Sequence, residues 1–205
     1  MTSPVDLIVG LGNPGADYAA TRHNAGVWFV ERLAAQLGVS FRQEKKFFGR
    51  TAQGSLGGRE VRLLLPDTYM NESGRSVAAY VNFYRIPVAH CLIAHDELDF
   101  AIGKVRLKRG GGLAGHKGLK DIAACLGSDQ SFARLRIGVG HPGDKERVTG
   151  HVLGKIRESE RALVDDCIEA ALDVLPLAAK GEWEAAMNRL HSANPAGASA
   201  KTGGN

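Results

Sequence analysis

One histidine of this chain stands among residues that suit chemistry better than packing. His23 lies in residues 21–26, which read Thr-Arg-His-Asn-Ala-Gly and come just before a segment with a helical apolar face. A neutral imidazole in such a place could accept a proton from water, which is the work of a general base. The alternative is a histidine at the start of a helix that has no chemical role.

Asp96 is the acid best placed to support such a base. It follows residues 91–94, whose apolar run predicts a buried strand, and ligand sites of open α/β sheets lie at the carboxyl ends of strands. From there its carboxylate could bind the far nitrogen of the imidazole and stabilise the protonated ring. Alternatively, Asp96 or Asp99 only starts a turn, as aspartate often does.

Two asparagines could supply amide hydrogen bonds. Asn13 lies between Gly12 and Pro14, and Asn71 comes shortly before Ser73, which is expected to cap a helix. An amide near a base can hold a carbonyl group, or donate to the oxyanion that forms during acyl transfer. Either asparagine could instead fill a turn or precede a cap, and the residues alone leave both possibilities open.

Residues 104–120 carry cations but no acidic residue. The cations are Lys104, Arg106, Lys108, Arg109, Lys117 and Lys120, and they surround the glycines 110–112 and 115. Exposed backbone N–H groups and lysines both suit phosphate, so the stretch predicts a phosphate-binding surface. Arg134, Arg136, Lys145 and Arg147 could extend it. The alternative is a solvated face, which is the usual meaning of a run of charges.

Residues 10–15 match the letters of the dinucleotide-binding pattern G-x-G-x-x-G but not its context. Pro14 and Gly15 interrupt the chain, and the next helix is expected only near His23. The acid at about the right distance, Glu31, falls inside that helix rather than at the end of a second strand. The pattern therefore gives little support for a nicotinamide cofactor.

Metal and serine chemistry are poorly supported as well. The 7 histidines show no H-E-x-x-H or H-x-H spacing, although His95, Asp96 and His116 could converge in space. A G-x-S-x-G elbow is missing. Cys91, Cys125 and Cys167 stand far apart in apolar settings, so we expect reduced, buried thiols in the cytoplasm.

The 205 residues with a net charge of +4 suit one domain, and a nucleic-acid partner is permitted but not required. No apolar run approaches the roughly 18 residues that span a bilayer, and the N-terminus lacks a targeting pattern. We therefore expect no membrane association.

Strand-like and helix-like segments alternate along the chain and must position these side chains. Strands are predicted over 5–9, 50–56, 60–65, 91–94, 104–108 and 135–139, and helices from near 23 to 37, from 73 to before 87, and over 119–126, 159–179 and 183–190. Gly57 and Gly58 predict a hairpin turn, and Pro176 is expected to kink or split its helix. This pattern predicts an α/β protein, a single-domain α/β/α sandwich with a mixed central sheet flanked by helices. Residues 192–205 are predicted to form a disordered tail behind a catalytic domain of residues 1–191.

Together these motifs resemble bacterial peptidyl-tRNA hydrolase. The matching segments are residues 10–15, 21–26, 68–71, 95–99, 115–119 and 134–143, and the likeness runs in order from about residue 5 to 190. The resemblance implies a monomeric, cofactor-free, cytoplasmic hydrolase. It would cleave the ester between a peptide and the 3′ end of tRNA, and so recycle tRNA from aborted translation.

The resemblance also assigns roles residue by residue. His23 matches the catalytic base, Asp96 the acid that stabilises it, and Asn13 the asparagine that tells blocked from free aminoacyl-tRNA. Residues expected to contact the substrate are Tyr18, Tyr69, Met70, Asn71, His116 and Lys117. Residues expected near the tRNA phosphates are Lys108, Arg136 and Lys145.

Lys117 departs from the family pattern, which usually has asparagine at this position; Leu113 and Ala114 also differ from it. Desolvating a lysine without a partner is costly, so we expect Lys117 to point outward toward the tRNA rather than into the pocket. A different class of function remains open, because some relatives of this fold bind RNA without hydrolysing esters. The presence of His23, Asp96 and both asparagines argues against that class.

Overall fold

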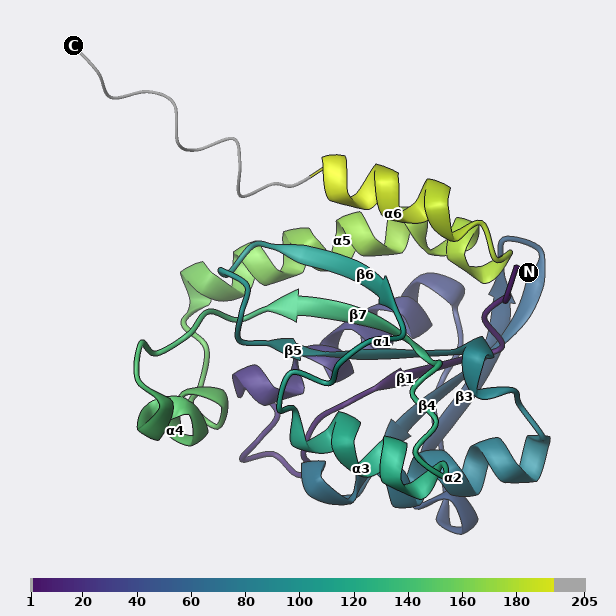
Figure 1. The fold of residues 1–205 in the computed structure, drawn as a ribbon, viewed down its shortest axis with the longest axis horizontal. Coiled ribbons are helices and arrows are strands. Elements are labelled where there is room, and N and C mark those ends of the chain that lie inside the picture. The colour runs from purple at the N-terminus through teal and green to yellow at the C-terminus, as the bar shows by residue number, and fades with distance from the viewer. Residues whose placement is uncertain (1, 194–205) are drawn as a thin grey trace.

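A mixed sheet of seven strands forms the centre of the computed structural model, which describes residues 2–193 (Figure 1). The strands are β1 (Leu7–Gly10), β2 (Arg42–Glu44), β3 (Gly49–Leu56), β4 (Arg59–Pro66), β5 (Cys91–Glu97), β6 (Val105–Arg109) and β7 (Ala133–Gly138). Their order is β2-β3-β4-β1-β5-β7-β6. The central pairs β4–β1, β1–β5 and β5–β7 are parallel, whereas the outer pairs β2–β3, β3–β4 and β6–β7 are antiparallel.

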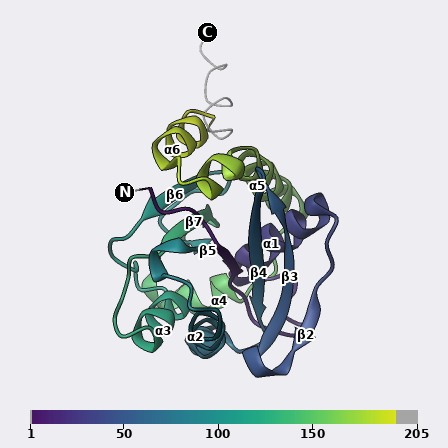
Figure 2. The same cartoon turned by 90° about the vertical axis from the view of Figure 1, so that its right-hand side faces the viewer.

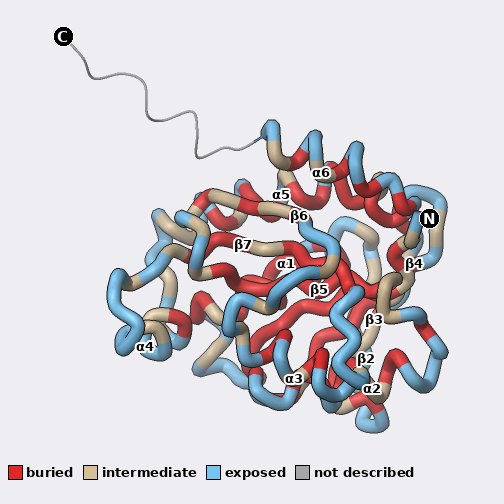
Figure 3. The backbone as a smooth tube through the Cα atoms, viewed as in Figure 1, coloured by how far each residue is buried: buried red, intermediate tan, exposed pale blue. Residues whose placement is uncertain are grey.

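Helices cover both faces of this sheet. They are α1 (Ala25–Leu37), α2 (Ser73–Tyr84), α3 (Lys117–Cys125), α4 (Val148–Val152), α5 (Glu158–Ala179) and α6 (Trp183–Ser192). Helices α1, α5 and α6 pack on one face, while α2 and α3 pack on the other (Figure 2). Successive side chains of a strand point to opposite faces, so on β1 Ile8 enters the first core while Leu7 and Val9 enter the second. The predicted sandwich is confirmed, with its central strands buried on both faces (Figure 3).

Glycines explain two of the boundaries that the sequence predicts. Gly57 and Gly58 both have positive φ, 58° and 79°, as the tight turn between β3 and β4 requires. Gly38 ends α1 in the left-handed conformation, with its N–H bonded to the carbonyl groups of Ala34 and Ala35. The hairpin and the end of this helix are therefore confirmed.

A close approach of α1 to the sheet brings residues 21–26 to the ends of β1 and β5. A Cβ on Gly26 would lie 2.1 Å from the carbonyl oxygen of Ala94, and one on Gly10 would lie 2.5 Å from the carbonyl oxygen of Gly26. Only glycine fits at either place without a shift of the backbone. This contact sets His23 beside the carboxyl end of β5.

Several predicted boundaries are wrong. Strand β5 continues beyond residue 94 to Glu97, so Asp96 lies inside the end of the strand rather than after it. Ser73 does not cap α2: it is the first residue of that helix, and its Oγ donates to the carbonyl of Met70 at 2.7 Å. A short 3-10 turn over Met70–Glu72 precedes the helix and moves its start. The three-residue strand β2 and the five-residue helix α4 are not predicted at all.

The structure corrects two of the predictions for the C-terminal part of the chain. Helix α5 runs unbroken through Pro176 to Ala179, so a split is wrong, while a kink at this proline stays a prediction. Helix α6 continues to Ser192, which is the first residue of the predicted tail. Residues 194–205, where the rest of that prediction falls, lie outside the described residues. Within residues 2–193, no helix combines the length and apolar character needed to cross a bilayer.

Candidate active site

His23 and Asp96 meet at the carboxyl end of the sheet. Nδ1 of His23 lies 2.9 Å from both carboxylate oxygens of Asp96. The Asp96 side chain is 2% exposed and that of His23 is 12% exposed. A ring nitrogen that faces a carboxylate carries the proton, so Nδ1–H donates and Nε2 of His23 keeps its lone pair.

His116 binds the same carboxylate from the other side. Its Nε2 lies 2.8 Å from Oδ1 of Asp96, while its Nδ1 accepts the backbone N–H of Leu119 at 3.4 Å as part of the N-terminal cap of α3. An acceptor at Nδ1 requires the proton of the neutral ring to be on Nε2. Asp96 therefore receives one N–H from each of two histidines.

The electrostatics of the site keep Asp96 ionised. Burial by itself would raise the pKa of the Asp96 carboxyl, but the attraction of His23 and His116 and the hydrogen bonds from both hold this pKa well below its usual range. His95 packs its ring on that of His116, with centroids 4.9 Å apart, and donates from Nδ1 to the carbonyl of Asp96. Burial lowers the pKa of His95 to about 3, so this ring is neutral at ordinary pH.

The same three side chains have the composition of a metal site. His23, Asp96 and His116 offer ligand atoms within 4.8 Å of one another, and two histidines with one carboxylate are a common ligand set. The two ring nitrogens nearest Asp96 carry its hydrogen-bond protons, and His116 would have to give up its bond from Leu119 to bind a metal through Nε2. The described contacts therefore form a hydrogen-bonded triad.

Asn13 is fixed by its neighbours in one orientation. Its Oδ1 accepts the backbone N–H of Met70 at 2.7 Å, and its backbone exchanges two hydrogen bonds with the side chain of Asn24 at 2.9 and 3.0 Å. The oxygen is thus engaged, and the amide nitrogen Nδ2 is the group that remains for a ligand. Asn13 can act in the pocket as a donor rather than an acceptor.

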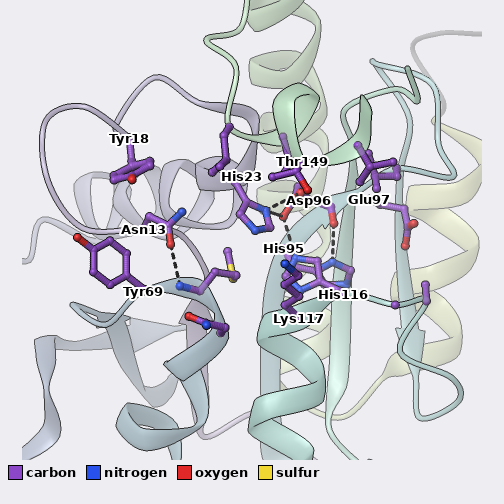
Figure 4. Close-up of a pocket in the computed structure, with 18 residues that line it drawn as sticks. Asn13, Tyr18, His23, Tyr69, His95, Asp96, Glu97, His116, Lys117 and Thr149 are labelled. Carbon is purple, nitrogen blue, oxygen red and sulfur yellow. Dashed lines mark hydrogen bonds and ion pairs between the residues drawn. The ribbon is translucent and has the colours of Figure 1, made fainter. Parts of the chain in front are cut away.

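A pocket of about 350 Å³ opens between these groups. The predicted site residues that line it are Asn13, Tyr18, His23, Tyr69, Met70, Asn71, Asp96, His116 and Lys117. Asn13 and the two tyrosines lie on one side, and His23, Asp96 and His116 lie on the other (Figure 4). The rings of Tyr18 and Tyr69 meet edge to face at 6.2 Å, and Tyr69 is 56% exposed.

An apolar wall of this pocket was not predicted from the sequence. Helix α4 and the residue after it supply Val148, Thr149, Val152 and Leu153, and Leu98 follows β5. Residues 148, 152 and 153 are apolar at helical spacing, which is a signal for a short amphipathic turn. One turn is too short for that signal to stand out from a loop.

The predicted cationic residues differ in their exposure and in their contacts. Lys108, Lys117 and Lys145 are exposed, and Lys117, at the start of α3, also lines the pocket, so its outward pose stays a prediction. Arg136 is 17% exposed, pairs with the buried Glu97 at 2.9 Å, and covers the ring of Phe100. Lys108, Arg136 and Lys145 do not line the pocket.

Arg134 does not contribute to the predicted phosphate-binding surface, which corrects the prediction for this residue. Only 1% of the residue is exposed, and its guanidinium donates to the carbonyl groups of Gly110 and Gly112, both at 2.7 Å. Its role is to hold the glycine loop in place. A charged residue counted within a basic stretch can therefore be buried and committed to the backbone.

The thiols fit the sequence analysis only in part. Cys91 and Cys167 are buried, but Cys125 is exposed at the end of α3 and so contradicts the expectation of three buried thiols. Burial raises the pKa of the Cys91 thiol to about 12. A thiol that stays protonated is a poor nucleophile, so Cys91 belongs to the core.

Comparison with known proteins identifies the family. The family model described as peptidyl-tRNA hydrolase matches residues 7–198. The chain belongs to the peptidyl-tRNA hydrolase family. The peptidyl-tRNA hydrolases of Azotobacter vinelandii and Pectobacterium carotovorum are 57% and 55% identical to it, over 92% and 95% of this chain and 97% and 100% of their own.

A solved structure agrees with this assignment. The crystal structure of peptidyl-tRNA hydrolase from Acinetobacter baumannii has a TM-score of 0.91 and 51% sequence identity, and covers 95% of this chain and 98% of that chain. The resemblance drawn from the motifs is confirmed. The expected fold and the expected enzyme class, a hydrolase of the peptidyl-tRNA hydrolase family, are confirmed with it.

Proposed function

We propose that this enzyme hydrolyses the ester between a peptide, or an N-blocked aminoacyl group, and the 3′ end of tRNA, with His23 as the general base. It would act as a cytoplasmic monomer without a cofactor and return tRNA from aborted translation. The observation that carries the proposal is the orientation of His23. Its Nδ1 is held by Asp96 at 2.9 Å, which leaves Nε2 as a free base in the pocket.

The chemistry follows from that orientation. Nε2 of His23 takes a proton from water, and the water oxygen bonds to the ester carbonyl carbon. Asp96 stabilises the imidazolium that forms, as a buried carboxylate can without taking the proton itself. When the bond from that carbon to the ribose oxygen breaks, the imidazolium returns the proton to the leaving oxygen.

Asn13 supplies the amide for the substrate's acyl part. Because its Oδ1 is engaged by Met70, its Nδ2 would donate to a carbonyl oxygen of the blocked aminoacyl group. A free aminoacyl-tRNA offers a charged amine in place of that peptide carbonyl. A site built to hydrogen-bond one group rejects an analogue that lacks it, so Asn13 would favour blocked substrates.

The tRNA would be held by charge and by stacking at the rim. Lys108, Lys117 and Lys145 are exposed cations that suit phosphate, and Arg136 has part of its charge committed to Glu97. Phosphate contacts give affinity without reading sequence, which suits an enzyme that must accept many tRNAs. Tyr18, Tyr69 and Asn71 would contact the acceptor end at the mouth of the pocket.

Turnover of N-acetyl-aminoacyl-tRNA is the experiment that tests this function. We expect release of the N-acetyl amino acid from the tRNA, and much slower release from the matched free aminoacyl-tRNA. Binding of both RNAs without release of either acyl group would favour the alternative, an RNA-binding protein on the same fold. It would contradict the proposal.

A further inference from the structure

Arg22 is a buried arginine beside His23 that the proposed chemistry does not use. Its Nη1 lies 3.3 Å from the carbonyl oxygen of His151, 3.5 Å from that of Gly154 and 3.3 Å from that of Lys155. Its Nη2 pairs with Oε2 of Glu160 at 2.8 Å, and its side chain is only 11% exposed. These partners lie 129 to 138 residues away in the sequence.

The carbonyl groups that Arg22 binds belong to the end of α4 and the turn after it. The last carbonyls of a helix lack partners within the helix, and a cation is favourable at that end. The backbone adds to the contact, because Arg22 N–H donates to Gly154 at 3.2 Å and Ile156 N–H donates to Ala20 at 3.0 Å. The segment of the general base is therefore bonded directly to the segment that follows α4.

Helix α4 forms the apolar wall of the pocket. Val148, Thr149, Val152 and Leu153 all line it, and Leu153 is 38% exposed, which leaves an apolar side chain for a ligand to cover. The helix has only five residues and lies at one edge of the molecule (Figure 1). Too short to be stable alone, it depends on contacts to the rest of the fold for its position.

We propose that Arg22 is a positioning residue that holds the α4 wall against the substrate's acyl group. This inference rests on the proposed function of the pocket. Arg22 touches no reacting atom, and its contacts lead to the wall rather than to the imidazole or to Asp96. Loss of its guanidinium therefore weakens substrate binding and leaves proton transfer by His23 intact.

Steady-state kinetics of Arg22→Gln with N-acetyl-leucyl-tRNA test the proposal. We expect KM to rise about ten-fold or more, with kcat within about two-fold of wild type and an unmoved pH–rate profile. Arg22→Lys keeps the charge but not the planar set of donors, so it should restore little. The matched control is Arg32→Gln, which removes a different arginine–glutamate pair to α5, that of Arg32 in α1 with Glu169 at 2.6 Å, and should leave KM unchanged.

Two outcomes would overturn the proposal. An unchanged KM in folded Arg22→Gln means that the wall needs no such anchor, and a fall in kcat with an altered pH profile means that Arg22 acts through His23. If Arg22→Gln fails to fold, Glu160→Gln removes the charge that Arg22 pairs with, and also the ion pair of Glu160 with Arg157 at 3.1 Å; a smaller rise in KM is expected. Amide exchange of Leu153 and Gly154 should quicken in either variant but not in Arg32→Gln. Failure of the wild type to release N-acetyl-leucine would refute the proposed function instead.

Discussion

Replacing Asp96 with asparagine should inactivate the enzyme, because the proton of the neutral His23 ring would move from Nδ1 to Nε2. The carboxylate accepts an N–H from each of two rings, at 2.9 Å from His23 and 2.8 Å from His116. An amide can accept only through its oxygen. Because Leu119 donates to Nδ1 of His116 and keeps the proton on Nε2, the amide oxygen takes the place of Oδ1 beside His116, and the NH₂ takes the place of Oδ2, 2.9 Å from Nδ1 of His23. His23 then accepts at Nδ1 and carries its proton on Nε2, where the base should be.

The size of the effect follows from the cost of restoring the productive tautomer. That tautomer would set two buried N–H donors against each other, at about 1–3 kcal/mol each. The sum, about 2–6 kcal/mol, corresponds to a rate loss of roughly 30-fold to 10⁴-fold. The variant also lacks the negative charge that stabilises the imidazolium, so we expect kcat to fall by about 10³–10⁴-fold.

Two measurements check this prediction. Hydrolysis of N-acetyl-aminoacyl-tRNA is measured for Asp96→Asn, with Asp99→Asn as the control, because Asp99 is an exposed neighbour in the turn after β5. ¹⁵N NMR of the histidine rings reports which nitrogen of His23 is protonated. A folded Asp96→Asn variant with more than about a tenth of wild-type kcat, or with Nδ1 of His23 still protonated, would refute the reasoning.

Three further predictions concern the groups around this centre. Asn13→Asp replaces a donor with a carboxylate, so the ratio of activity on blocked and free aminoacyl-tRNA should fall at least ten-fold; an unchanged ratio in paired assays removes Asn13 from that role. Lys108→Ala and Lys117→Asn should each weaken tRNA binding and lower the slope of log K against log salt by up to about one unit, and an identical slope returns these lysines to a solvated surface. His95 has a pKa of about 3 in the folded protein and about 6.5 in the unfolded chain, so between these pH values it is neutral when folded and protonated when unfolded. The free energy of unfolding therefore falls by up to about 1.4 kcal/mol per pH unit as the pH drops from 6.5 to 3. Urea unfolding of His95→Asn at pH 6 and pH 4 should show a shallower pH dependence than wild type, and equal dependence contradicts the assignment.

Local patterns were enough to predict six of the seven strands and the place of His23 and Asp96. The apolar run before Asp96 indicates a buried strand, and the glycines around residues 10–15 and 21–26 indicate a helix packed close to it. Both are local patterns that can be recognised in a single sequence. The rule that parallel strands end at a shared edge then brings His23 and Asp96 together. The observed distance of 2.9 Å agrees with that inference.

The rest of the site depends on contacts between distant residues. The bonds from Arg22 to the segment after α4 join residues more than a hundred positions apart, and five residues give a helix no clear periodicity. Burial of Arg134 under the glycine loop depends on the orientation of β7, which charge counting ignores. The proton on His116 is set by its place at the cap of α3, and the predicted start of that helix, residue 119, lies two residues after the observed one.

Single-turnover hydrolysis by His23→Ala tests the central claim most directly, because it separates chemistry from binding. With enzyme in excess over N-acetyl-aminoacyl-tRNA, we expect the cleavage rate to fall by about 10²-fold or more while the uncleaved substrate still binds tightly. Thermal unfolding of the variant shows that it is folded. A cleavage rate near that of wild type in this folded variant would contradict the assignment of His23 as the general base.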